Sequence, residues 1–211
     1  MGNGDRLFVY GAGGHGRVVA ESAARSGLRI EGFIDDSGQN GITRSEFLER
    51  AAKERFSVAL AIGDNKTRRK IALELNKNSV EIATIIDPSA QVSCSAHIGK
   101  GAVILAGAVV NSQARIEEGA IVNSGAVVEH DCVIGAYAHV SPNAALAGGA
   151  RAESLAHIGI GACLINNVSV GKESIVGAGA VVTKDILPFC TAVGAPARAI
   201  KSKIDEKPAQ E

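Results

Sequence analysis

The stretch from Val110 to Val128 reads VNSQARIEEGAIVNSGAVV, and an aliphatic residue returns in it at every sixth position. The same period runs without an insertion from Ile86 to Val181, which is 96 residues or sixteen hexads. The first position is aliphatic in every hexad, and the fifth is alanine in thirteen of them. At the roughly 45 to 50% apolar usage of an average chain, this phasing would arise by chance about once in 10⁵.

A period of six fits neither an amphipathic helix nor a hairpin sheet, which need spacings near 3.6 and 2. It is typical of a solenoid, in which each hexad forms one side of a triangular prism. The aliphatic residue then fills the interior, and the small residue fits the tight corner. Three hexads make one coil, so the repeat predicts a little over five coils and a rod about 25 Å long. Crossover sterics alone would favour a right-handed coil.

The chain has 211 residues, with 22 basic and 22 acidic side chains. Because the formal net charge is zero, the chain has no excess of basic residues that would attract nucleic acid or an anionic membrane, and we expect neither as a partner. The longest apolar run, Ala102 to Val110, is far shorter than the roughly 20 residues of a membrane span, and the sequence starts without the apolar core of a signal peptide. We therefore expect a cytoplasmic protein without a membrane span.

The four cysteines, Cys94, Cys132, Cys163 and Cys190, form neither a CxxC pair nor a metal-site spacing. We expect them to be reduced thiols. Cys132 occupies the small fifth position of its hexad, which favours a core filler over a nucleophile.

Residues 1–84 precede the repeat and predict a Rossmann-like βαβαβ domain of the α/β class, followed by the all-β solenoid domain at residues 85–211. Three hydrophobic segments are expected to form strands, and two further segments are expected to form helices. The strands are Arg6–Tyr10, Arg29–Ile34 and Ser57–Ile62, and the helices are Arg17–Ser26 and a charged segment that begins at Lys66.

A glycine loop, Gly11–Gly16, joins the first strand to the first helix. Glycines let a ligand approach the backbone, and the free amides of a helix start favour negative charge. The second strand ends at Asp35 and Asp36, where a carboxylate can bind ribose hydroxyls. The loop satisfies the GxGxxG spacing of dinucleotide dehydrogenases. A domain of this length, however, contains only one of the two mononucleotide-binding halves that a dinucleotide needs. A nucleotide-linked ligand fits better, and the alternative is that the glycines only form a tight turn.

Three histidines of the repeat are candidates for chemistry. His130 lies in the run Glu129-His130-Asp131, where an adjacent carboxylate would make it a plausible general base, the alternative being a solvated surface side chain. His139 and His157 are one 18-residue coil apart and should stack at one edge of the prism. We expect His157 to be a surface neighbour or a contact residue. His130 and His139 are half a coil apart, so they should lie on different sides of a prism about 15 Å across. If both act in one reaction, the site lies between prisms, and a closed ring of three would build it.

Several of these segments together resemble the NeuD and PglD branch of the hexapeptide-repeat sugar O- and N-acetyltransferases. They are the glycine loop, Asp35-Asp36, Ala61-Ile62-Gly63, Glu129 to Cys132, Ala138 to Ser141 and Val193 to Ala197. The resemblance extends over essentially the whole chain. It implies a left-handed parallel β-helix, acetyl-CoA as the donor without a metal, and homotrimers with active sites between subunits.

The resemblance also assigns roles by position. It makes His130 the catalytic base and Asp131 the carboxylate that enhances its basicity, with Glu129 an alternative. His139 would contact the thioester region of acetyl-CoA, and Gly148, Ile160 and Ala178 would lie along the pantetheine groove. The nucleotide-linked amino sugar would be held by Gly13, Gly14, His15, Asp35, Asp36 and Gly63. Lys66 stands where one member of this branch has an acidic residue, which suggests a different sugar.

The activity that follows is N-acetylation of the 4-amine of a UDP-linked 4-amino-4,6-dideoxy or trideoxy sugar, as in bacillosamine synthesis. O-acetylation of a sialic acid or another sugar hydroxyl, and N-acetylation of a GDP-linked sugar such as perosamine, remain open. Two other classes are a zinc carbonic anhydrase, for which no closely spaced histidine pair accompanies a third, and a sugar-nucleotide sensor that binds without catalysis. No serine or thiol is placed for an acyl-enzyme, so direct transfer is expected.

Overall fold

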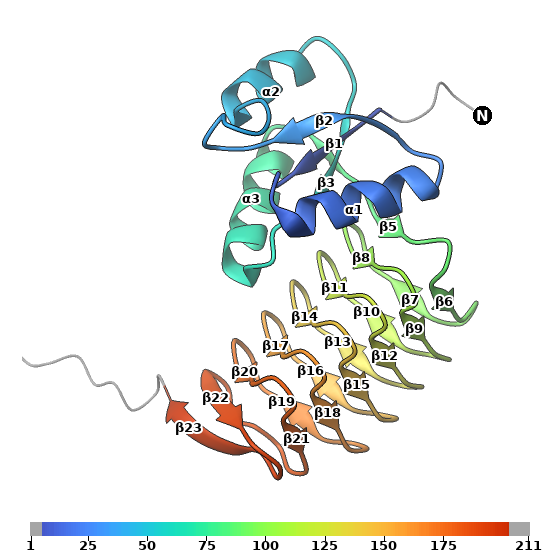
Figure 1. Cartoon of the computed structure of the whole chain (residues 1–211), viewed down its shortest axis with the longest axis vertical. Helices are drawn as coiled ribbons and strands as arrows, with labels where there is room; N and C mark the ends of the chain where they lie inside the picture. Colours follow the sequence, from blue (N-terminus) through green and yellow to red (C-terminus); the bar gives the residue numbers. More distant parts are fainter. Residues whose placement is uncertain (1–5, 203–211) are drawn as a thin grey trace, which may run out of the picture.

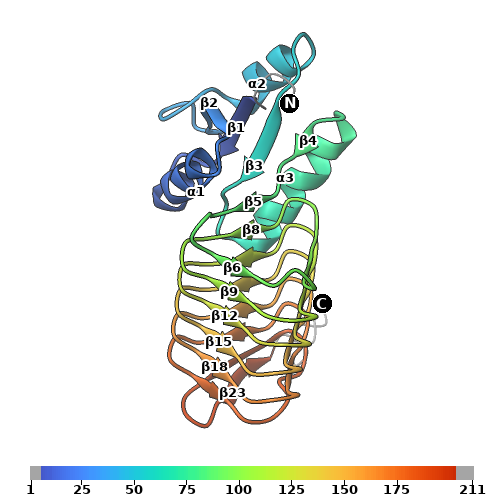
Figure 2. The same cartoon turned by 90° about the vertical axis from the view of Figure 1, so that its right-hand side faces the viewer.

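The computed structural model describes residues 6–202. A small α/β domain lies against one wall of a long β-solenoid, and the coils of the solenoid succeed each other along its axis (Figure 1). Seen from the side, the coils form a regular stack beneath β1, β3 and α3 (Figure 2). The arrangement confirms the fold class that the hexads and the glycine loop predict.

The α/β domain has a four-stranded parallel sheet in the order β2-β1-β3-β4, one strand and one helix more than the predicted βαβαβ unit. Its elements are β1 (Arg6–Tyr10), α1 (Gly14–Arg25), β2 (Arg29–Ile34), α2 (Arg44–Ala51), β3 (Ser57–Leu60), α3 (Asn65–Lys77) and β4 (Glu81–Ile82). The first helix begins at Gly14, three residues earlier than the hydrophobic pattern indicates. The glycines at 14 and 16 are thus part of the helix, not of the loop before it.

The helix starts have identifiable caps. Thr43 and Glu46 form a capping box on α2, with the Thr43 hydroxyl accepting from the Glu46 amide and the Glu46 carboxylate accepting from the Thr43 amide. Asp64 caps α3 through the Thr67 amide at 2.8 Å. The first turn of α1 has no side-chain cap at Gly13, so its amides are left for another partner.

The solenoid is built from two-residue strands, each made of the sixth position of one hexad and the first of the next. They are β5 (Ile85–Ile86), β6 (Gln91–Val92), β7 (His97–Ile98), β8 (Val103–Ile104), β9 (Val109–Val110), β10 (Arg115–Ile116), β11 (Ile121–Val122), β12 (Val127–Val128), β13 (Val133–Ile134), β14 (His139–Val140), β15 (Ala145–Leu146), β16 (Arg151–Ala152), β17 (His157–Ile158), β18 (Cys163–Leu164), β19 (Ser169–Val170), β20 (Ile175–Val176) and β21 (Val181–Val182). Pairs such as Arg115 with Val133 are parallel and 18 residues apart.

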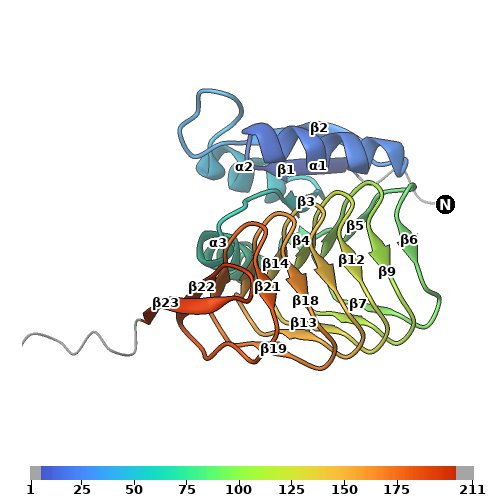
Figure 3. The ribbon, with the colours of Figure 1, turned by 60° about the horizontal axis from the view of Figure 1, so that its bottom comes forward.

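Three walls result, as Figure 3 shows. They are the sheets β7-β10-β13-β16-β19, β6-β9-β12-β15-β18-β21 and β5-β8-β11-β14-β17-β20, and the third continues into β22 (Cys190–Val193) and the antiparallel β23 (Arg198–Ser202). The coil has the left-handed sense that the family resemblance implies, and the crossover rule for ordinary parallel sheets therefore gives the wrong hand here.

The tight corner falls at the fourth position of the hexad, one residue before the alanine that we assigned to it. Backbone φ is positive at every fourth position from Gly101 to Gly179, in the range +55° to +73°. Glycine is favoured there because it has no Cβ to strain, although Tyr137 and Leu155 also adopt this conformation. The alanine that follows points inward and is fully buried from Ala102 onward.

The two domains share their hydrophobic cores. Leu7 and Val9 of β1 cluster with Val103 and Ile121 of the solenoid, so burial is continuous across the junction. On the other side of the sheet, Tyr137 and Leu155 of the solenoid corner join the core around α3. The first coil is less covered, and Ile86 is 38% exposed. The α/β domain is therefore packed firmly on the wall that contains β14 and β17.

Candidate active site

His130 and Asp131 lie together at the corner between β12 and β13. The Nδ1 atom of His130 is 2.8 Å from the Asp131 carboxylate, and both side chains are exposed. Because the carboxylate can only accept, a neutral ring in this contact carries its proton on Nδ1, and Nε2 then has the free lone pair. Asp131 is the corner residue with φ +60°, a conformation that aspartate tolerates better than most residues.

Glu129, the alternative carboxylate, is not on the ring. Its Oε2 atom accepts from Asn111 Nδ2 at 3.1 Å and from the His130 backbone amide at 3.3 Å. The geometry of an imidazole oriented by a carboxylate is therefore made by Asp131, and Glu129 holds the backbone of the corner instead.

Gly148 lies directly under the His130 ring, one coil further along the axis. A Cβ atom at this position would be 2.5 Å from both Cε1 and Nε2 of His130, so any other residue would displace the imidazole. Cys132 is buried nearby and donates to the Ala147 carbonyl at 3.2 Å. Burial raises the pKa of the Cys132 thiol, which makes it unreactive.

The glycine loop meets the solenoid at the carboxyl ends of β1 and β3. Gly16 is required by close packing, since a Cβ there would be 1.8 Å from the Gly11 carbonyl oxygen. Gly13 and Gly63, in contrast, have no atom within 4 Å of such a Cβ and face open space. Together with the uncapped start of α1, this leaves room and free amides for an anionic ligand.

The two aspartates after β2 have different surroundings. Asp35 accepts hydrogen bonds from the amides of Ser37 and Asn40 and from the Ser37 hydroxyl, and these bonds hold its pKa below the usual value. Its oxygens thus shape the loop that follows. Asp36 is exposed and accepts from the Tyr10 hydroxyl at 2.7 Å, which leaves a lone pair for a ribose hydroxyl. The ligand contacts of both residues stay predictions.

Three imidazoles meet at the junction of the domains. The ring of His139 is 4.9 Å from that of His157 and 6.2 Å from that of His15, centroid to centroid. The stacking of His139 and His157 confirms the one-coil spacing read from the sequence. His15 comes from the α/β domain, so the solenoid histidines lie beside the glycine loop.

Both nitrogens of His139 have partners within the chain. Nδ1 is 3.4 Å from the Gly63 carbonyl oxygen and donates to it, and Nε2 accepts from Asn123 Nδ2 at 3.0 Å. Burial, and then the charges nearby, lower the pKa of His139 to about 3 and that of His15 to about 4. The rings are neutral at physiological pH. A contact of His139 with the acetyl-CoA thioester stays a prediction.

The residues assigned to the pantetheine groove are divided between two edges of the solenoid. Gly148 is on the edge with His130, whereas Ile160 and Ala178 lie one above the other on the opposite edge of the sheet that contains β15, β18 and β21. Ile160 is 54% exposed, and Ala178 is also exposed. Within one chain these residues do not enclose a groove together with His130.

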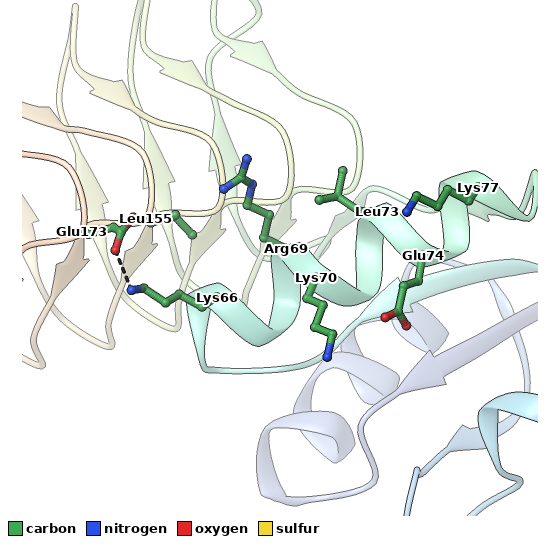
Figure 4. Close-up of a pocket in the computed structure, with 8 residues that line it drawn as sticks. All are labelled: Lys66, Arg69, Lys70, Leu73, Glu74, Lys77, Leu155 and Glu173. Carbon is green, nitrogen blue, oxygen red and sulfur yellow. Dashed lines mark ion pairs between the residues drawn. The ribbon is translucent and has the colours of Figure 1, made fainter.

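A cavity of about 530 Å³ contains none of the residues predicted to act. It lies between α3 and the solenoid corner (Figure 4), lined by Lys66, Arg69, Lys70, Leu73, Glu74, Lys77, Leu155 and Glu173. Lys66 is paired with Glu173 at 2.6 Å on the margin of this cavity. Sequence reasoning did not find this cavity or Arg68, because both depend on the docking of the two domains. It also missed Asn123 and Ser141, which bond to His139 and His157 within the solenoid.

Two further findings concern residues 6–202. No group of three or more histidine, cysteine, aspartate or glutamate side chains in this range could hold a metal ion. No helix in the same range is long and apolar enough to cross a bilayer.

The hexapeptide solenoid is the fold of the bacterial hexapeptide transferases, and in this chain it carries an amino-terminal parallel α/β domain. Residues 6–75 match the family described as the PglD N-terminal domain, and residues 113–148 match the bacterial transferase hexapeptide repeats. The chain belongs to the PglD/NeuD-type sugar acetyltransferases.

Three proteins illustrate the relationship. PerB from Caulobacter crescentus, solved with CoA and GDP-perosamine, is 34% identical with a TM-score of 0.90, over 95% of this chain and 99% of that one. The acetyltransferase domain of PglB from Neisseria gonorrhoeae, solved with acetyl coenzyme A, is 39% identical with a TM-score of 0.88, over 94% and 100%. UDP-N-acetylbacillosamine N-acetyltransferase of Bacillus subtilis is 40% identical over 110 residues, 47% of this chain and 51% of that protein. The alignment thus spans about half the length of the curated relative.

Proposed function

We propose that the protein transfers the acetyl group of acetyl-CoA to the 4-amine of a UDP-linked 4-amino-4,6-dideoxy or trideoxy sugar of the UDP-2-acetamido-4-amino-2,4,6-trideoxyglucose type. The single observation that carries the proposal is the His130–Asp131 pair on an exposed edge, in which Nδ1 faces the carboxylate and Nε2 is the nitrogen left for a substrate. The Bacillus subtilis relative supports the choice of sugar by its name.

In the proposed reaction the amine nitrogen attacks the thioester carbonyl. The C–N bond forms, the C–S bond breaks, and His130 Nε2 takes the proton from the nitrogen and returns it to the departing CoA thiolate. Such base catalysis contributes typically about 10²- to 10⁴-fold in rate, and holding donor and acceptor in line contributes further. Asp131 keeps the ring in the tautomer that this step needs.

The nucleotide part would bind at the glycine loop. Gly13 and Gly63 leave open space there, and the first turn of α1 begins beside Gly13 without a side-chain cap. A diphosphate suits this end of a helix because the free N–H groups and the helix dipole both favour negative charge. His15 and Asp36 would contact the remainder of the nucleotide sugar.

We propose a homotrimer as the assembly that completes the site. Ile160 and Ala178 are exposed on one edge of the solenoid and His130 on another. A ring of three subunits would bring the first edge of one chain to the second edge of its neighbour. The donor would then lie in the cleft between two solenoids.

A GDP-linked amino sugar is the second candidate acceptor. It is favoured by the likeness to PerB, which extends over nearly the whole of both chains. O-acetylation of a sugar hydroxyl would use the same base.

A thiol-release assay with acetyl-CoA separates these substrates. We expect release with a UDP-linked 4-amino sugar, much weaker release with the GDP-linked sugar, and none with a sialic acid. Release with the hydroxyl acceptor alone would identify an O-acetyltransferase. Binding of the nucleotide sugar without any release would identify a sensor.

A further inference from the structure

Arg68 is a fully buried cation at the junction of the two domains. Its Nε donates to the Gly119 carbonyl at 2.9 Å, and Nη2 donates to the Tyr137 carbonyl at 2.7 Å. Both carbonyls belong to solenoid corners. The same guanidinium donates through Nη1 to the Ile62 carbonyl at 2.8 Å and through Nη2 to the Asn65 side chain at 2.9 Å, on the α/β side.

All the hydrogen-bond acceptors of Arg68 are neutral oxygens. Among residues 6–202 no carboxylate forms an ion pair with this guanidinium, in contrast to Arg25, which pairs with the buried Asp87. Burial lowers the pKa of Arg68 to about 10, so the side chain remains charged at neutral pH. A buried charge without an ion-paired carboxylate costs free energy, since hydrogen bonds replace only part of the lost hydration. Asp64 acts on this charge without forming an ion pair with it.

The guanidinium lies beside the place where the nucleotide would bind, since it donates to the carbonyls of Ile62 and Gly63. Arg68 contributes to the lowered pKa values of His15, His139 and His157, so its field reaches the glycine loop and both solenoid rings. The three rings stay neutral and add no charge of their own. The Nε2 atom of His15 is buried and has no partner within the described chain.

Arg68 also fixes the backbone beside this place. The Ile62 carbonyl accepts from Nη1, and the next carbonyl, of Gly63, accepts from Nη1 at 3.3 Å and from His139 Nδ1 at 3.4 Å. One guanidinium therefore sets the position of the turn after β3 relative to the histidines of the solenoid.

Building on the proposed function, we propose that Arg68 is a positioning residue for the nucleotide sugar: it fixes the Ile62–Gly63 turn on the solenoid, and its buried charge is balanced by the ligand's diphosphate. The residue does not touch the reacting atoms. Its contribution depends on the diphosphate, so it should be large for a nucleoside diphosphate and small for the nucleoside.

Calorimetric binding of UDP and uridine to the wild-type protein is the reference for the test. Arg68→Gln should weaken UDP on the order of 10-fold, because a favourable charge interaction inside a protein is lost, while uridine binds as before. Arg68→Lys, which keeps the charge, should stay within about 3-fold of wild type for UDP. The KM for the nucleotide sugar should rise in Arg68→Gln, whereas the KM for acetyl-CoA stays constant.

Lys70→Gln is the matched control. It removes the same charge from the same helix, but Lys70 is exposed to solvent, where screening makes the loss small. Equal weakening of UDP in Lys70→Gln and Arg68→Gln would overturn the proposal, as would equal weakening of UDP and uridine in Arg68→Gln.

A second variant decides the matter if Arg68→Gln does not fold. Asp64→Asn keeps a good helix cap on α3 but removes the carboxylate that acts on Arg68 and His157. We expect UDP to bind a few-fold more tightly and uridine to be unchanged, because the positive field is then less offset. Unchanged UDP affinity in this variant would contradict the proposal. Wild-type protein that binds UDP but never releases CoA would refute the enzyme function and leave the role of Arg68 standing.

Discussion

At the scale of single residues, the structure shows which of the two carboxylates beside His130 contacts its ring. Both neighbours of His130 are acidic, and a run of three polar residues does not show which carboxylate faces the ring. The positive φ of Asp131 turns its side chain back onto the imidazole, while Glu129 binds Asn111. The backbone conformation of the corner therefore decides that Asp131, and not Glu129, contacts the imidazole.

We expect His130→Ala to lower kcat by about 10²- to 10⁴-fold, because the amine loses its proton acceptor, while the affinity for acetyl-CoA stays near wild type. Steady-state rates of thiol release and calorimetric binding of acetyl-CoA measure the two effects. Asp131→Asn should also slow turnover, and Glu129→Gln is the matched control that should leave it nearly unchanged. A variant without His130 that turns over normally would remove this residue from the mechanism.

Gly148→Ala should impair catalysis although no functional group is lost. The added methyl group would occupy space within 2.5 Å of the His130 ring, so the imidazole must rotate away from its productive position. A displacement of this size can cost about 10²-fold in rate. The measurement is kcat together with the chemical shifts of the His130 ring; unchanged shifts and unchanged kcat would show that the ring does not depend on this glycine.

At the scale of elements, the hexad predicts the strands because a branched side chain is buried at the same point of each coil. The corner was assigned one residue too late. Glycine or asparagine recurs at the fourth position, for example at Gly107, Gly125 and Asn143, and this pattern would have located the left-handed turn. The helix α2 was left undefined despite the Thr43-x-x-Glu46 pattern of its capping box.

The corner glycines give a test of stability. In Gly125→Ala the new Cβ would be strained by φ +65° and would also lie 2.3 Å from Asn143 Oδ1, whereas in Gly161→Ala only the backbone strain at φ +64° applies. We expect Gly161→Ala to lower the free energy of unfolding by about 1–2 kcal/mol and Gly125→Ala to lower it more. Urea denaturation of both variants measures the difference, and equal losses would mean that the Asn143 contact relaxes without cost.

At the scale of the whole molecule, the candidate site is divided between surfaces that one chain cannot bring together. The sequence predicts that His130 and His139 lie on different sides, because half a coil separates them. It could not predict that His15 meets His139 and His157, or that Arg68 spans the junction, since these contacts depend on how one domain is placed on the other. The spacing along the repeat predicts where residues lie within the solenoid, but not which of them contact the α/β domain.

The division of the site predicts complementation between inactive subunits. His130→Ala removes the base, and Ala178→Trp should block the opposite edge where the donor is proposed to bind. Trimers reassembled from a mixture of the two variants should recover part of the wild-type rate, because some interfaces then combine an intact His130 with an intact Ala178. Thiol release from mixed and unmixed samples measures this recovery. A mixture as inactive as its components, or an active monomer by sedimentation, would contradict the shared site.

The contacts that hold the α/β domain on the solenoid fix the distance between the glycine loop and the coil that carries His130. Arg68 and Asn65 attach α3 to the corners near Tyr137 and Leu155, and Arg25 attaches α1 to Asp87 at the first coil. Two anchors on separate helices prevent the glycine loop from sliding along the axis. The distance from the proposed phosphate site to the coil of the proposed base is then constant. We therefore predict that only a sugar whose amine projects that far from its nucleotide is acetylated.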